Sequence, residues 1–204
     1  KATRPVLTGP SNQAVKSGKT ATFSVTVSTA GVPAPDSYEW QYSSNGGSTW
    51  NTLGSTLGSS TITKTTTSSA YTINVSNCTK NITGYKFRVV VKQSSENLTT
   101  TSSAGTLTVY YPPTLSGPSN IAVGAGDTAS FTVNITNKGN YPYYNITWYR
   151  NGSAVSTKTG QSAASQTYSV TASSGMNGHQ VYCVITPYVT SSTEADLITV
   201  TSNQ

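Results

Sequence analysis

The chain has 204 residues, a formal net charge of +6 and only 9% charged residues. Serine and threonine make up about a third of it, and hydrophobic residues 34%. This composition favours β-strands with polar outer faces, and the length favours two domains. Neither a run of 18 apolar residues nor a signal peptide is evident, so we expect no membrane insertion in this segment and, for a secreted protein, a mature or excised form.

The excess positive charge belongs to the first half of the chain. Residues 1–110 hold nine lysines and arginines against three acidic residues, whereas residues 111–204 hold three of each. The two halves are therefore expected to differ in their surface charge.

An internal repeat relates the two halves. Pro5–Val27 matches Pro113–Ile135 at an offset of 108 residues, with thirteen of 23 positions identical and no gap. Later matched pairs have smaller offsets, as expected for shorter loops in the second copy: Tyr71 with Tyr168, Gly84 with Gly178, and Val109 with Val200. We expect two copies of one domain, covering residues 1–110 and 111–204, each complete with an opening and a closing strand.

Within each copy, apolar residues recur at every second position. Phe23, Val25 and Val27 alternate with polar residues in TATFSVTVS, and the same pattern follows in YEWQY and YKFRVVVK. Such alternation predicts half-buried antiparallel strands. About seven short strands in about 100 residues, with turns such as NGG between them, predict a sandwich of two sheets.

Tryptophan and cysteine positions fit an immunoglobulin sandwich, in which a Trp on strand C packs against a disulfide between strands B and F. Trp40 and Trp148 occupy the Trp position. Cys183 faces inward on strand F of the second copy, but its strand B counterpart, Phe131 or Val133, is not a cysteine. We therefore predict that Cys183 is a small buried apolar residue.

The other cysteine, Cys78, lies in NVSNCTKNITG between strands E and F of the first copy. We expect it on a loop, either as a free surface thiol or as a link between chains.

These motifs resemble the bacterial immunoglobulin-like modules of secreted and cell-wall proteins. YEWQYSSNGGSTWNTL with GYKFRVVV, and MNGHQVYCVI with a closing LITV strand, carry the resemblance. The first copy lacks the strand F cysteine, and the second lacks the hairpin tryptophan and has His179 where tyrosine is usual. YPYYNITWYRNGS also resembles archaeal surface proteins, so the host stays open. The resemblance implies an all-β fold, two tandem immunoglobulin-like antiparallel β-sandwiches, at an extracellular or cell-surface location.

The sequence offers little catalytic material. It has six acidic residues, one histidine and two isolated cysteines. We expect no enzyme, no cofactor and no metal site, because no Cys/His cluster has metal-ligand spacing. Glu194 and Asp196 share a strand face, but two carboxylates make a poor calcium site, and we expect them to be solvated.

Seven asparagines begin the sequon N-x-S/T, which is only a weak excess over chance in a chain so rich in serine and threonine. Their placement on expected loops or outward strand positions leaves N-glycosylation as a hypothesis. The seven are Asn74, Asn77, Asn81, Asn97, Asn134, Asn145 and Asn151.

Two surface features suggest ligands. Lys86, Arg88 and Lys92 line the outer face of strand F and would suit an acidic polymer, although a solvated face with Arg88 paired to Glu39 explains them as well. Nucleic acid is not expected, since no aromatic residues interleave with these basic ones.

Aromatic side chains form the second feature. Trp50 and the Tyr141–Tyr144 cluster would stack on sugars, or else pack the hairpin and a strand end.

Three functions follow in order of preference. The first is a structural or adhesive module that projects from a microbial cell surface or binds a protein or glycan there. The second is a subunit of a self-assembling extracellular filament, whose partners are copies of itself. The third is a carbohydrate-binding module.

Overall fold

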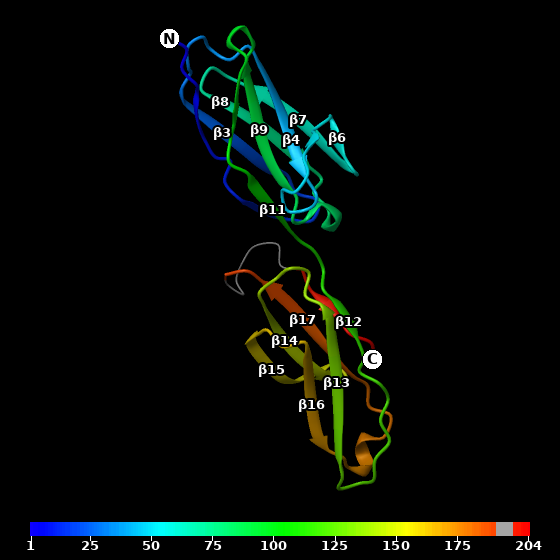
Figure 1. Ribbon diagram of the computed structural model, residues 1–204. Coiled ribbons are helices and arrows are strands. Elements are labelled where there is room, and N and C mark those ends of the chain that lie inside the picture. Colours follow the sequence, from blue (N-terminus) through cyan, green and yellow to red (C-terminus); the bar gives the residue numbers. More distant parts are fainter. Residues whose placement is uncertain (191–197) are drawn as a thin grey trace. The chain divides into compact units, whose positions relative to one another are not determined.

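The computed structural model describes residues 1–190 and 198–204 and contains two compact units, Lys1–Tyr111 and Pro112–Gln204. The division lies one residue from the predicted boundary. Each unit is a pair of mainly antiparallel sheets, and the short helical turns are single 3-10 turns (Figure 1). The prediction of an all-β chain with two tandem immunoglobulin-like sandwiches is confirmed.

The first unit has one sheet in the order β1-β3-β8-β7-β6 and a second in the order β2-β11-β9-β4-β5, with β10 also paired to β9. Its strands are β1 Val6–Thr8, β2 Gln13–Lys16, β3 Ala21–Thr29, β4 Ser37–Ser43, β5 Asn51–Thr52, β6 Thr56–Leu57, β7 Ser60–Thr66, β8 Ala70–Ser76, β9 Lys86–Gln93, β10 Leu98–Thr101 and β11 Gly105–Tyr110. The 3-10 turns are η1 Lys80–Ile82 and η2 Ser94–Glu96.

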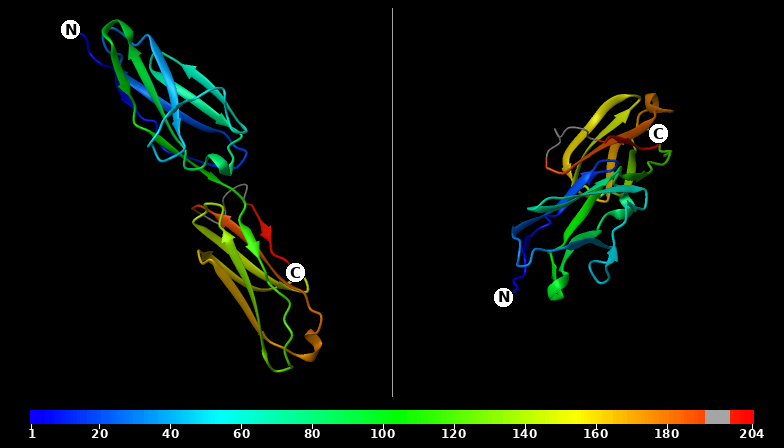
Figure 2. Two further views of the ribbon diagram at one scale, coloured as in Figure 1. Left: turned by 45° about the vertical axis from the view of Figure 1, so that its right-hand side comes forward. Right: turned by 90° about the horizontal axis from the view of Figure 1, so that it is seen from above.

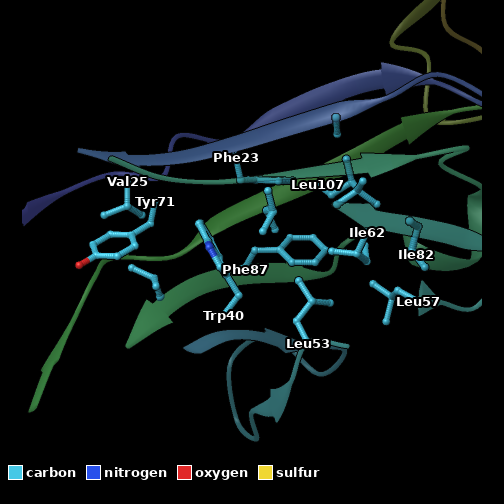
Figure 3. Packing of buried hydrophobic residues seen from close by; sticks show 14 of the residues in the cluster. Phe23, Val25, Trp40, Leu53, Leu57, Ile62, Tyr71, Ile82, Phe87 and Leu107 are labelled. Atoms are coloured by element: carbon cyan, nitrogen blue, oxygen red, sulfur yellow. The ribbon is translucent and has the colours of Figure 1, made fainter. Parts of the chain in front are cut away.

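The core of the first unit fills the space between its two sheets. Alternate residues of β3, β8, β9 and β11 point inward, as the period of two requires. Phe23 and Phe87 have ring centroids 4.7 Å apart, and Trp40 and Leu107 join the same cluster (Figure 3). All four side chains are fully buried.

The second unit has sheets in the orders β12-β13-β16 and β15-β14-β17-β18. Its elements are β12 Thr114–Ser116, β13 Thr128–Asn137, β14 Tyr143–Arg150, β15 Ser153–Gln161, β16 Ser165–Thr171, η3 Ser174–Met176, β17 Val181–Tyr188 and β18 Val200–Thr201. Figure 2 shows these elements from two further directions.

Matching turns explain part of the repeated sequence. Gly9 and Gly117 have φ angles of 90° and 81°. A Cβ there would lie 2.8 Å from the Ser24 carbonyl oxygen and 2.6 Å from the Thr132 carbonyl oxygen. Only glycine fits such a conformation and such a close backbone approach, so GPSN recurs in both copies.

The register identifies which residues are true counterparts. Trp40 lies opposite Val89 and Trp148 opposite Cys183, so strands C and F match between the units. In the first unit the Ser102 N–H donates to the Val89 carbonyl, and the Val89 N–H donates to Ser102 Oγ. Ser202 makes the same two bonds with Cys183, so Ser202 is the counterpart of Ser102.

This register corrects two sequence alignments. Val200 stands at the position of Thr100, because each lies two residues before the matched serine, and it is not the counterpart of Val109. β18 therefore corresponds to β10, and the expectation that Val200 matches Val109 in a closing strand is wrong.

The tyrosine alignment also fails. Tyr71 pairs with Val25, whereas Tyr168 pairs with Phe131, the counterpart of Phe23. The two tyrosines thus occupy different positions along their strands.

Candidate functional site

Cys78 is fully buried in the core of the first unit. Its N–H donates to the Lys19 carbonyl at 2.9 Å, its carbonyl accepts from the Gly18 N–H at 2.8 Å, and its Sγ donates to the Val75 carbonyl at 3.1 Å. The expectation of a surface thiol or an interchain link is wrong, because these bonds turn the loop inward.

Cys183 is also fully buried, on β17 opposite Trp148. Both cysteines are free thiols. Burial raises the pKa of each thiol above its ordinary value, so the neutral form is favoured in the folded protein.

We expect neither thiol to react appreciably with Ellman's reagent in the folded protein at pH 8, and both to react in 6 M guanidinium chloride. The thiolate is the nucleophile, and burial disfavours it. The raised pKa values also mean that the folded state holds protons which the unfolded state releases. The contribution to stability is therefore present below about pH 8.5 and is lost as pH rises through the folded pKa values. Rapid labelling of Cys78 in the folded chain would contradict its burial.

Arg88 links β9 to the neighbouring strand β4 and to the hairpin beyond it. Its Nε and Nη2 donate to Gln41 Oε1 at 2.9 and 2.8 Å, and Gln41 Nε2 donates to Glu39 Oε1 at 2.7 Å. The guanidinium carbon lies 3.9 Å from the centroid of the Trp50 ring. Arg88 thus reaches Glu39 through Gln41 instead of by the direct pairing considered above, and desolvation lowers its pKa.

Trp50 is held over its own hairpin, since its indole N–H donates to the Gly47 carbonyl at 3.0 Å. One face of the ring is covered by Arg88. In the basic row, Lys92 is exposed and Lys86 is half-buried. Acidic-polymer and sugar binding at these residues stay predictions.

Replacing Arg88 with alanine is expected to lower the free energy of unfolding of the first unit by about 1–2 kcal/mol. The change removes a cation–π contact and two hydrogen bonds from a charged donor, all in a half-exposed setting. Denaturant unfolding of the full chain measures the loss. Lys92→Ala is the matched control on the same strand, with an expected change within about 0.5 kcal/mol. Equal losses in both variants would show that the contacts of Arg88 contribute nothing.

The tyrosine cluster is mostly core. Tyr141 and Tyr144 are buried, and the Tyr144 hydroxyl donates to the Ala163 carbonyl at 2.7 Å. Tyr143 is 46% exposed and lies beside Tyr188, with ring centroids 5.8 Å apart. Of the two readings given for this cluster, Tyr141 and Tyr144 therefore fit packing, and Tyr143, next to Tyr188, is the exposed tyrosine of the cluster.

Every sequon asparagine is at least partly exposed. Asn74 and Asn145 are half-buried on strands, and their side-chain oxygens accept hydrogen bonds from Thr22 and Gly160. The exposed ones are Asn77, Asn81, Asn97, Asn134 and Asn151.

Among the described residues, no group of three or more His, Cys, Asp and Glu side chains is placed to hold a metal ion. Glu194 and Asp196 lie outside the described residues. No helix of the described part is long and apolar enough to cross a membrane.

A groove of about 710 Å³ lies along the second unit. Its walls come from the segment between β12 and β13, the ends of β13 and β16, η3 and the beginning of β17. Its lining includes Ile121, Val123, His179 and Val181. No sequence motif pointed to this groove, because its lining residues come from segments far apart in the chain.

Taken together, the facing sheets and the buried tryptophan opposite strand F define both units as immunoglobulin-like β-sandwiches. No protein-family model matches the chain, and no curated protein matches it.

Solved structures do resemble it. The ICAM-5 D1–D4 ectodomain fragment superposes with a TM-score of 0.57 at 10% identity, covering 98% of this chain and 49% of that one. The four N-terminal Ig domains of Dscam1 isoform 6.9 give a TM-score of 0.50 at 18% identity, with 99% and 45% covered. The chain spans about half the length of these structures, and at such identities the likeness shows the fold.

Proposed function

We propose that the chain is a structural or adhesive module of a microbial extracellular or cell-surface protein. The observation that carries the proposal is the architecture: two immunoglobulin-like sandwiches in tandem, each with its own apolar core. Such sandwiches are common building blocks of cell-surface proteins. The similarity to the ICAM-5 and Dscam1 ectodomain structures supports this use of the fold.

Immunogold labelling of source cells with an antibody against the chain tests the proposal. Label on the envelope or in the medium is expected. Label confined to the cytoplasm would overturn the proposal. Deletion of the coding sequence, followed by a surface-attachment assay, then separates an adhesive role from a purely structural one.

We further propose that exposed sequons carry N-glycans in the native protein, because each offers an accessible side chain on a loop, turn or strand surface. Glycopeptide mass spectrometry of the natively purified protein is expected to find higher occupancy at Asn81 and Asn97 than at Asn74 and Asn145, whose side chains are half-buried and bonded to their neighbours. Peptides of unmodified mass at all seven sequons would reject the hypothesis.

A further inference from the structure

Strand F carries different outward residues in the two units. β9 and β17 match at an offset of 94 residues, because Val89 and Cys183 each lie opposite the strand C tryptophan. The three cations of β9 are replaced by uncharged residues in the second unit: Gln180 for Lys86, Tyr182 for Arg88 and Thr186 for Lys92. β17 nevertheless pairs with β14 along its whole length. The fold therefore does not require the basic row (Lys86, Arg88 and Lys92), which points to a role on the surface of the first unit.

Arg88 is held in place but keeps N–H groups for a ligand. Of the five N–H donors of a guanidinium, one on Nε and one on Nη2 bond to Gln41 Oε1, at 2.9 and 2.8 Å. Its carbon lies 3.9 Å from the centroid of the Trp50 ring. The Nη1 group makes no hydrogen bond within the described part of the chain. An arginine already fixed by its neighbours loses little freedom on binding, and the planar guanidinium fork matches the two oxygens of a carboxylate.

The charge of the basic row is not balanced by the carboxylates near it. Glu39 accepts a hydrogen bond from Gln41 at 2.7 Å, and Asp36 accepts from the Ser94 N–H and hydroxyl at 2.9 and 2.8 Å. Neither lysine of the row has a partner for its Nζ among residues 1–190 and 198–204. The row spans six residue steps along β9, or about 20 Å. The excess positive charge of the chain lies in residues 1–110, and this strand presents part of it as a line that suits an extended anionic chain.

The surroundings of the basic row favour one class of anionic chain. Val90, the outward residue between Arg88 and Lys92, is only 8% exposed, so the row presents no apolar side chain to a membrane or to an apolar peptide. Single-stranded nucleic acid needs successive aromatic platforms, whereas Arg88 contacts one ring, that of Trp50. Hydroxyl groups flank the row instead. Those paired across the sheet with its lysines or with Gln41 belong to Ser37, Thr52, Thr99 and Thr106. Cations among hydroxyl groups suit a chain that carries both carboxylates and hydroxyls.

We propose that the outer face of β9 in the first unit binds an acidic polysaccharide. Its carboxylates meet Arg88 and the two lysines of the basic row, and its hydroxyls meet the serine and threonine hydroxyls beside them. Each contact is weak because the face is exposed, so useful affinity comes from the repeated groups of a polymer that engage several copies of the chain at once. The inference rests on the adhesive form of the proposed function, for which it names the binding surface and the ligand class.

Binding of the full 204-residue chain to immobilised polygalacturonate and hyaluronate at low salt tests the proposal, with neutral dextran as the blank. The double variant Lys86→Gln/Lys92→Thr installs the residues of the second unit, so it is expected to fold normally and to bind about tenfold more weakly. Lys19→Gln/Lys80→Gln is the matched control, because it removes the same two charges from exposed side chains outside β9 and is expected to change binding less than twofold. Equal weakening in both pairs would overturn the proposal, since binding would then follow net charge alone.

Further measurements fix the ligand class and the role of Arg88. Arg88→Lys keeps the charge but loses the fork, and it is expected to weaken binding several-fold while denaturant unfolding shows that the first unit remains folded. The same binding measured with single-stranded DNA and with phosphatidylserine vesicles is expected to be weaker. Tighter binding to either one, or no binding to both polysaccharides, would overturn the proposal. Surface location is measured independently by immunogold labelling, so a failure of polysaccharide binding leaves the proposed extracellular location standing.

Discussion

Replacing Trp40 with alanine is expected to lower the free energy of unfolding of the first unit by about 3–5 kcal/mol. The side chain is fully buried opposite Val89, between the two sheets. Removing it leaves a cavity that the rigid β-framework closes only in part. Since small domains have about 5–15 kcal/mol of stability in total, the variant is expected to unfold at a much lower denaturant concentration. Hydrogen exchange in β3 and β9, followed against denaturant in the full chain, measures the loss.

Trp40→Phe is the control for size and polarity. The Trp40 indole N–H is buried without a hydrogen-bond partner among the described residues. Phenylalanine removes that N–H but keeps most of the apolar volume. The loss of unfolding free energy in Trp40→Phe is therefore expected to be well below the loss in Trp40→Ala. Exchange in the second unit, which has its own Trp148, should not change. A loss of unfolding free energy below about 1 kcal/mol in Trp40→Ala would show that the tryptophan contributes little to the stability of this core.

Periodicity was sufficient to predict the sandwich. Residues such as Phe23, Val25 and Val89 must alternate with polar ones when one face of a strand is buried. This alternation does not depend on the length or conformation of the loops. Because the second copy repeats the sequence of the first, the same fold could be predicted for it. The strand C tryptophan was identifiable because no other residue in the motif has its size.

The burial of Cys78 was not predictable from its neighbours in sequence. NVSNCTKN is as polar as an exposed loop. Its cysteine turns inward because the backbone of Lys19, about sixty residues earlier, accepts its N–H. That contact depends on how the two sheets face each other, which local sequence does not encode.

The closing strand of the second copy was assigned wrongly for a different reason. LITV and TLTV both have apolar residues at their second and fourth positions, so a period of two cannot distinguish the position of β10 from that of β11. Only the paired hydrogen bonds of Ser202 with Cys183 fix the register.

Leu107→Ala tests how much β11 contributes to the stability of the first unit. Leu107 is fully buried in the cluster that contains Phe23 and Phe87. We expect the first unit to lose about 3–5 kcal/mol of unfolding free energy, the range of buried leucine truncations that leave a cavity. Denaturant-dependent hydrogen exchange at β2, β9 and β11 in the full chain measures the loss.

Thr108→Ala is the matched control, because Thr108 lies on the opposite face of the same strand and is only half-buried. Its expected cost is below about 1 kcal/mol. A small loss for both variants would mean that the burial of Leu107 contributes little to the stability of the first unit.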